Sequence, residues 1–261
     1  MLRRVSNKIN LRKRLDRFFQ TNSSRKNLTF FLDMISTTDE VVVFGGCIRD
    51  IALYGIRNFR SDIDIVFTGS QKKLKEIMME LDPRYEVKIN KFGGFRAKVG
   101  IWDVDIWSLK ATWAFKNNFV KFNGEESLLL TTITNWDAIY FKWRKREIVC
   151  IDSYFEDILS GHLSLVLPFN PNILGSLVRI LRFNFMKEAN FFSHELGKFL
   201  LKNFDSFSVS DVINYEKQSY PLDTYLTHSS VDKLLRIVKD NIDTKKDIKL
   251  TPRNQTEDMF N

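Results

Sequence analysis

The stretch that decides the fold reads GGCIRD at residues 45–50 and is followed, twelve residues later, by DID at residues 62–64. An apolar, β-branched run at residues 41–44 precedes the two glycines. A glycine pair between a strand and a helix exposes backbone N–H groups that can bind an anion such as phosphate. Carboxylates at positions i and i+2 of a strand share one face, where they can hold a hard divalent cation. Together, the two motifs favour nucleotidyl transfer.

Nucleotidyl transfer needs carboxylates that hold two metal ions, roughly 3.5–4 Å apart, on one face of a sheet. Asp62 and Asp64 provide two of them, and the expected strand at residues 101–107 provides a third. Asp103 and Asp105 both qualify by strand alternation. Asp105 is preferred because it lies between aliphatic residues, where a carboxylate without a cation is costly. Asp62, Asp64 and Asp105 are therefore the predicted catalytic and metal-binding residues, with Mg²⁺ as the metal and Mn²⁺ as its alternative.

These motifs resemble the head domain of class II CCA-adding enzymes and bacterial poly(A) polymerases, which are members of the DNA polymerase β-like nucleotidyltransferase superfamily. In that family the Gly-Gly turn binds the triphosphate and the two aspartates bind magnesium. The resemblance implies that Gly45, Gly46 and Arg49 contact the nucleotide. Asp50 joins them as a nucleotide-site candidate because it lies in the first turn of the expected helix and can brace the site through hydrogen bonds, with simple charge complementarity to the helix N-terminus as the alternative. The resemblance also implies an α+β fold, in which a mixed sheet flanked by helices is followed by a helical neck and body domain.

The resemblance covers residues 40–185 and includes two departures. Residues 135–139 occupy the place of a ribose-binding segment but lack its arginine pair. Arg179 and Arg182 match the helix that reads the incoming base, whereas Gly175 and Ser176 replace its acidic pair. A serine hydroxyl is a weaker and less selective acceptor than a carboxylate, so altered base selection is predicted. Both arginines are nucleotide-binding candidates, and for Arg182 a helix-surface role is the alternative.

Basic residues are concentrated in two segments of a chain whose net charge is +8. Residues 1–26 carry nine Lys or Arg residues against one acid, and residues 142–146 read KWRKR. Such clusters attract polyanions such as nucleic acid, although a solvated helix face or tail would look the same at the N-terminus. The candidates for RNA contact are Arg12, Lys13, Arg14, Lys142, Arg144, Lys145 and Arg146.

The 261 residues are expected to form a basic helical segment at 1–36, a catalytic domain at 37–168 and a helical domain at 169–261. Periodicity predicts two helices within 7–36 and further helices at 47–54, 70–81, 135–145, 171–187, 191–203, 209–217 and 229–241. Strands are predicted at 41–44, 63–67, 85–89, 95–99, 101–107, 128–133 and 148–151.

The two cysteines imply no disulfide framework, and neither a signal peptide nor a membrane span is recognisable, so a cytoplasmic protein is expected. The predicted activity is metal-dependent transfer of NMP from an NTP to the 3′ end of an RNA, with tRNA as the acceptor. An enzyme that alters tRNA ends as a toxin or in defence fits as well as a maturation enzyme.

Two alternatives stay open. The acceptor could be a protein or small molecule, or the chain could be a catalytically silent RNA-binding homologue. The preferred nucleotide, and any protein partner or second copy of the chain, also remain open.

Overall fold

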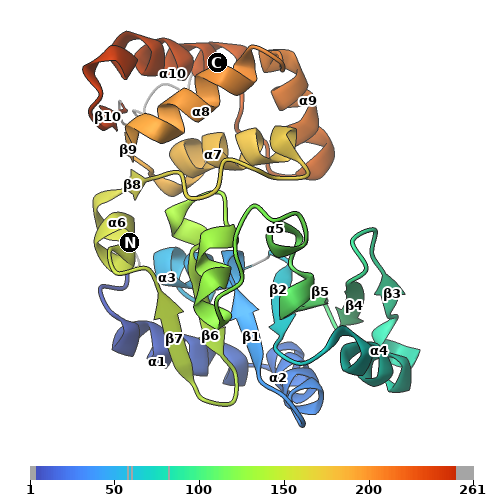
Figure 1. Cartoon of the computed structure of the whole chain (residues 1–261). Coiled ribbons are helices and arrows are strands. Elements are labelled where there is room, and N and C mark those ends of the chain that lie inside the picture. Colours follow the sequence, from blue (N-terminus) through green and yellow to red (C-terminus); the bar gives the residue numbers. More distant parts are fainter. Residues whose placement is uncertain (1–3, 58, 60, 82, 251–261) are drawn as a thin grey trace. The chain divides into compact units, whose positions relative to one another are not determined.

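The computed structural model describes residues 4–250 except 58, 60 and 82, and it divides the chain into two compact units (Figure 1). Unit 1 contains the residues up to 132 together with 136–156, and unit 2 contains residues 133–135 and those from 157 onward. The N-terminal helices belong to unit 1 rather than to a segment of their own. The change of unit at residue 157 also falls earlier than the expected boundary at 168, because the strand that follows pairs within unit 2.

Unit 1 is built on a seven-stranded mixed sheet in the order β3-β4-β5-β2-β1-β6-β7. Its strands are β1 (Val41–Phe44), β2 (Ile63–Phe67), β3 (Lys88–Ile89), β4 (Phe95–Val99), β5 (Trp102–Ser108), β6 (Ile139–Lys142) and β7 (Glu147–Cys150). Its helices are α1 (Lys8–Gln20), α2 (Ser23–Ile35), α3 (Gly46–Tyr54), α4 (Gln71–Glu80) and the short α5 (Trp113–Lys116). The 3₁₀ turns are η1 (Pro83–Tyr85), η2 (Leu109–Ala111), η3 (Glu125–Thr131) and η4 (Asn135–Asp137).

Strand register determines which residues share a face of the sheet. Strands β2 and β5 are parallel, with Asp64 opposite Asp105, and β1 runs antiparallel to β2 with Phe44 opposite Asp64. Burial alternates along β5, where Trp102, Val104 and Ile106 are buried and the residues between them are half-buried. The sheet therefore has one apolar face and one face that carries the carboxylates.

Aromatic side chains from α1 and α2 cover the apolar face. Phe18 packs against Trp102 and Phe19 against Trp143, while the Trp102 indole donates to the Ser24 carbonyl. Side chains at three- and four-residue spacing supply this surface, so the helical periodicity seen in the sequence is explained by packing on the sheet. Asp103 and Asp105 alternate to the opposite face, where they are half-buried.

Three local predictions for unit 1 were wrong. Residues 135–145, predicted as a helix, form η4 and strand β6, because β-favouring residues there pair with both β1 and β7. Residues 128–133, predicted as a strand, lie mostly in η3. The strand expected over 85–89 is reduced to β3, since η1 occupies its start. The remaining strands of the sheet agree with the predictions to within a residue.

Unit 2 contains four main helices and a small sheet of order β10-β9-β8 (Figure 1). The helices are α7 (Ile173–Lys187), α8 (His194–Phe204), α9 (Val209–Ser219) and α10 (His228–Asn241), and η5 (Ile242–Thr244) follows. The strands are β8 (His162–Leu163), β9 (Phe191–Phe192) and β10 (Ile248–Lys249), while α6 (Tyr154–Ser160) spans the change of unit. Side-chain N-caps begin all four main helices, and Asn172 is the cap of α7.

Candidate active site

The Gly45-Gly46 turn connects β1 to α3 as the sequence predicts. Gly45 has φ 62° and ψ −116°, a conformation that L side chains rarely adopt. The amides of Ile48 and Arg49 bond to the Gly45 carbonyl, so the amides of Gly46 and Cys47 lie ahead of them at the helix N-terminus. The turn therefore provides amides and the positive end of a helix dipole, which suit an anionic phosphate.

Arg49 lies beneath this turn and is only 6% exposed. Its guanidinium donates to Asp50 Oδ1 at 2.8 Å and to Asp137, and it is 3.5 Å from the position that a Cβ on Gly46 would take. Burial alone lowers the pKa of Arg49, but the carboxylates of Asp137 and Asp50 raise it above its usual value. The structure thus places Arg49 and Asp50 in an internal ion-pair network, and contact of Arg49 with the nucleotide stays a prediction.

The carboxylates of the predicted site lie on neighbouring strands. Asp64 on β2 lies opposite Asp105 on the parallel strand β5, and Asp62 comes directly before β2. The residue opposite Asp64 on β1 is Phe44, after which the Gly45-Gly46 turn begins. The structure therefore brings the Gly45-Gly46 turn and the carboxylates together at one place in the sheet.

Asp103 and Asp105 differ in their partners. Asp103 is paired with Lys98 at 3.2 Å and its side chain is 43% exposed, whereas the Asp105 side chain is 27% exposed. Burial raises the pKa of Asp105, against the opposing effect of the Arg96 guanidinium. The partial burial of Asp105 and its register with Asp64 agree with the reason for preferring it to Asp103 as a candidate metal ligand.

Arg96 on β4 is a member of this cluster that the sequence analysis did not single out. Its Nη2 lies 2.5 Å from Asp62 Oδ2 and 3.4 Å from Asp105 Oδ2. The signal was present in the sequence, because a tight turn at Gly100 pairs residue 99 with 102 and so places Arg96 opposite Asp105. Asp137 was also missed as a partner of Arg49, and no local pattern indicates a pair separated by 88 residues.

Within the described part of the chain, no three Asp, Glu, His or Cys side chains are gathered as a metal site. The chemistry of the donor set nevertheless fits a hard divalent cation, since Asp62, Asp64 and Asp105 offer carboxylate oxygens from one face. The Arg96 guanidinium between Asp62 and Asp105 also marks a position at which these side chains already bind positive charge.

The arginines expected to read the base lie in unit 2, on α7. Arg179 is exposed, whereas Arg182 is buried and donates to Glu216 Oε1 at 2.6 Å and to Asp223 Oδ2 at 3.0 Å. Arg182 also lies over the ring of Tyr220, 3.9 Å from its centroid. Its guanidinium is engaged within unit 2, which contradicts the helix-surface alternative and leaves Arg179 as the exposed arginine of the two. Ser176 is buried and its hydroxyl donates to the Asn172 carbonyl.

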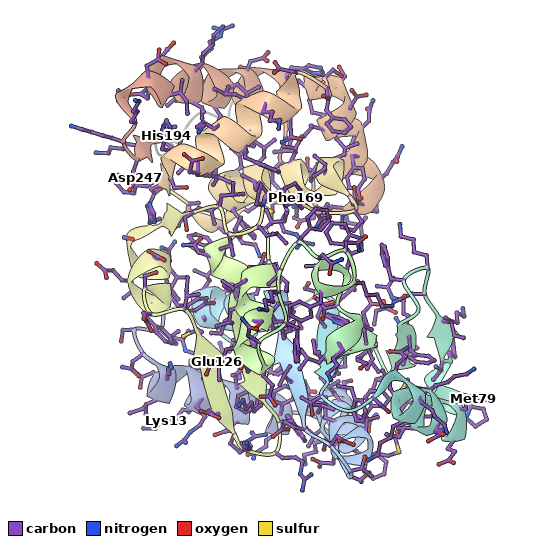
Figure 2. The ribbon with its side chains drawn as sticks, viewed as in Figure 1. Lys13, Met79, Glu126, Phe169, His194 and Asp247 are labelled. Carbon is purple, nitrogen blue, oxygen red and sulfur yellow. The ribbon has the colours of Figure 1, made fainter. Side chains whose placement is uncertain are left out.

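The RNA-contact candidates divide into exposed and engaged side chains. Arg12, Lys13, Arg144 and Lys145 are exposed, and Lys13 lies on the solvent-facing side of α1 (Figure 2). The other three make internal contacts: Arg14 with the Ile51 and Ala52 carbonyls, Lys142 with Glu125 and Glu147, and Arg146 with Asp16.

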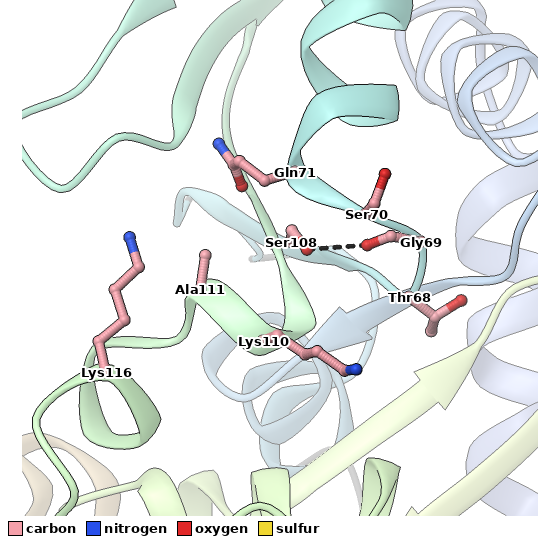
Figure 3. A pocket seen from close by; sticks show the side chains of 8 residues that line it. All are labelled: Thr68, Gly69, Ser70, Gln71, Ser108, Lys110, Ala111 and Lys116. Carbon is pink, nitrogen blue, oxygen red and sulfur yellow. Dashed lines mark hydrogen bonds between the residues drawn. The ribbon is translucent and has the colours of Figure 1, made fainter.

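An open pocket of about 410 Å³ lies where β2 and β5 end (Figure 3). Thr68, Ser70, Lys110 and Lys116 line it, and the Ser108 hydroxyl donates to the Gly69 carbonyl at 2.8 Å across it. Asp62 precedes the other end of β2, so this pocket is separate from the carboxylate cluster.

Comparison with known proteins supports the fold at low sequence identity. No family model and no curated protein matches the chain. A CCA-adding enzyme with CTP is 18% identical with a TM-score of 0.56, covering 90% of this chain and 61% of that one. A tRNA-processing enzyme complex is 18% identical with a TM-score of 0.58, covering 81% and 57%. A tRNA nucleotidyltransferase with a primer tRNA and an incoming ATP analogue is 18% identical with a TM-score of 0.54, covering 77% and 58%.

The chain therefore has the fold of the CCA-adding enzymes and tRNA nucleotidyltransferases, with a mixed sheet flanked by helices and a helical region after it. This confirms the fold class expected from the sequence. The chain spans about three fifths of the length of these structures. Among the described helices, none is both long and apolar enough to cross a bilayer.

Proposed function

We propose that this protein is a metal-dependent nucleotidyltransferase that transfers NMP from an NTP to the 3′ end of an RNA, with tRNA as the acceptor. The observation that carries the proposal is the register Phe44–Asp64–Asp105 across three adjacent strands, with the Gly45-Gly46 turn directly after Phe44. The fold shared with tRNA nucleotidyltransferases supports the same reading.

In this mechanism the turn binds the triphosphate through the Gly46 and Cys47 amides, while Arg49 holds the turn in place from beneath. Asp62, Asp64 and Asp105 would hold two Mg²⁺ ions, with Mn²⁺ as an alternative, and bound metal would acidify the attacking 3′-hydroxyl and neutralise the leaving pyrophosphate. The 3′-oxygen forms a bond to the α-phosphorus as the bond to the β-phosphate oxygen breaks. The hydroxyl proton leaves to solvent.

Base selection that differs from CCA-adding enzymes is part of the proposal. Gly175 lacks a side chain, and Ser176 is buried and carries no carboxylate, so neither residue offers the acceptor of an acidic pair. Arg179 is the remaining candidate on α7 for contact with the base. Such a change suits an enzyme that modifies tRNA ends, as a toxin or defence enzyme does. Both cysteines are free thiols, which supports a reducing, cytoplasmic location.

The proposal is tested by incubating the purified protein with Mg²⁺, each α-labelled NTP in turn, and total RNA or total protein. We expect label in RNA of tRNA size, and loss of a metal ligand in Asp64→Asn or Asp105→Asn should lower incorporation by at least about a hundredfold. Asp103→Asn is the matched control on the same strand and should retain most activity, because Asp103 is paired with Lys98.

Each contrary outcome has a definite meaning. Label in protein would replace the RNA acceptor with a protein acceptor. Incorporation that survives Asp64→Asn would refute the assignment of the carboxylates. An absence of label in every fraction would favour the silent RNA-binding homologue.

A further inference from the structure

Arg96 is a cationic side chain that contacts two of the three proposed metal ligands. It lies on β4 opposite Asp105, and its Nη2 is 2.5 Å from Asp62 Oδ2 and 3.4 Å from Asp105 Oδ2. Neither carboxylate belongs to its own strand, since Asp62 precedes β2 and Asp105 lies on β5. The guanidinium therefore joins two elements across the sheet at the point where the proposed function needs a divalent cation.

The strength of these contacts is limited by solvent. The side chains of Arg96 and Asp62 are 47% and 53% exposed, so water and salt screen their attraction. A guanidinium spreads one positive charge over a plane, whereas a divalent cation concentrates two at a point and prefers carboxylate oxygens as ligands. A cation that approaches Asp62 and Asp105 can therefore replace Arg96.

We propose that Arg96 competes with the divalent cation for Asp62 and Asp105, so that metal binds only as the guanidinium leaves. This inference rests on the metal site of the proposed function. It assigns Arg96 a role that differs from phosphate binding: it satisfies the two carboxylates while no metal is present and sets the metal concentration at which the site fills. Burial by itself lowers the pKa of Arg96 but Asp105 and Asp62 raise it, so the competitor stays charged.

Lys98 provides a matched control on the same strand. It lies two residues beyond Arg96 and is similarly exposed, at 42%, but its amine contacts Asp103 at 3.2 Å instead of the proposed metal ligands. Arg96→Gln and Lys98→Gln remove the same charge from neighbouring positions. A difference in Mn²⁺ affinity between the two variants therefore reports the contact of Arg96 with Asp62 and Asp105, because the loss of one positive charge near the site is common to both.

The test is calorimetric titration of Mn²⁺ into the full chain at low ionic strength, for wild type, Arg96→Gln, Arg96→Lys and Lys98→Gln. Because exposed ion pairs are weak, we expect Arg96→Gln to bind Mn²⁺ about three- to tenfold more tightly than wild type and Lys98→Gln to change by less than about twofold. Arg96→Lys should fall between wild type and Arg96→Gln, because an ammonium does not bridge two carboxylates as a guanidinium does. Far-UV circular dichroism verifies that each variant is folded.

Three results would overturn the competition: Arg96→Gln binds Mn²⁺ no more tightly than wild type, Lys98→Gln gains as much affinity as Arg96→Gln, or neither wild type nor Arg96→Gln binds Mn²⁺. Nucleotide incorporation by the same wild-type sample separates this outcome from failure of the proposed function. Incorporation without a gain in Mn²⁺ affinity in Arg96→Gln rejects the competition alone. A gain in affinity in a protein that incorporates no nucleotide rejects the function and leaves the competition in place.

Discussion

At the scale of single residues, Arg49 and Asp137 connect parts of unit 1 that are 88 positions apart in the sequence. Their side chains are 8% and 7% exposed, and Asp50 Oδ1 accepts a second bond from Arg49. A buried ion pair gains little over apolar packing, yet removal of one partner leaves an uncompensated charge. The pair therefore matters for stability because its breakage is costly.

We expect Asp137→Ala to lower the free energy of unfolding by about 3–5 kcal/mol, since Arg49 would stay buried with one carboxylate fewer. Urea denaturation followed by circular dichroism measures the loss. Glu76→Ala is the control, because Glu76 pairs with Lys72 on the surface at 4.0 Å and its loss should change stability by no more than about 0.5 kcal/mol. A loss below about 1 kcal/mol in Asp137→Ala would contradict a structural role for the pair.

Single residues also mark the limit of what the sequence could predict. Spacing alone indicated Asp62, Asp64 and a third carboxylate on another strand, because strand alternation is a local property. The inward orientation of Arg49 was not predictable, since it depends on Asp137 and on the position of β6 beside β1. The burial of Arg182 was likewise not predictable, because it depends on an ion pair with Glu216, which lies 34 residues further along the chain on α9.

At the scale of elements, the β1–α3 turn places two demands on Gly45. Its φ of 62° disfavours any side chain, and its position next to the residue opposite Asp64 ties its geometry to the site. Gly93 has a similar φ of 81°, with open space around it, in the loop between β3 and β4. A comparison of alanine substitutions at the two glycines therefore distinguishes the effect of backbone strain from an effect on the proposed site.

We expect Gly45→Ala and Gly93→Ala each to destabilise the protein by about 1–2 kcal/mol through left-handed strain. Gly45→Ala alone should raise the KM for NTP, about tenfold or more, because the amides at the start of α3 shift relative to the triphosphate. Steady-state incorporation kinetics at saturating RNA give this comparison. Equal KM values for the two variants would show that the turn does not bind the nucleotide.

In unit 2, His162 on β8 connects elements through two carboxylates. Its imidazole contacts Asp157 at 3.5 Å and Asp247 at 3.0 Å, and Asp247 lies just before β10. The hydrogen bond to Asp157 raises the pKa of His162 although burial opposes it, and Asp247 adds to the increase. A raised pKa means that the folded state holds the proton more tightly than the unfolded state.

The stabilisation from His162 is therefore complete below the unfolded pKa of about 6.5 and is lost as the pH rises through the higher folded value. We expect wild type to lose up to about 1 kcal/mol of stability over this interval, a small amount because Asp247 is exposed. His162→Gln should remove that pH dependence. Urea denaturation at closely spaced pH values, with His228→Gln as a control on α10, measures it. An identical pH profile in His162→Gln and wild type would rule out the coupling.

Secondary-structure elements were predicted correctly where residues close in sequence determine them, and wrongly where partners distant in sequence do. Strands β1, β2, β4, β5 and β7 were predicted because short apolar or alternating runs bounded by turns determine them locally. The segment 135–145 was misread as a helix because its strand character depends on two neighbouring strands that are distant in sequence. The aromatic residues in β6 carried the signal for a strand, but helical spacing of the same residues obscured it.

At the scale of the whole molecule, the two basic segments noted in the sequence belong to one region of unit 1. Arg146, at the end of the β6–β7 hairpin, pairs with Asp16 on α1 and lies over the rings of Phe141 and Trp143. The pair brings the exposed basic residues of α1, at 12 and 13, near those of the hairpin, at 144 and 145. The net charge of +8 favours polyanions in general, and this region offers four exposed cations.

We expect a variant with Gln at Arg12, Lys13, Arg144 and Lys145 to bind tRNA more weakly and with a smaller salt dependence. Each phosphate contact contributes a slope of about 0.7 to 0.9 in log K against log salt, so the loss of four contacts should reduce the slope by roughly 3 to 4. The control places Gln at four exposed cations of unit 2, Lys202, Lys233, Arg236 and Lys239, and so removes the same charge from the molecule. Fluorescence anisotropy between 50 and 200 mM salt, roughly the range over which such contacts weaken, gives both slopes. If the region around the Arg146–Asp16 pair binds the RNA phosphate backbone, the salt dependence of tRNA binding falls only in the first variant. An equal fall in both variants would mean that net charge alone attracts RNA.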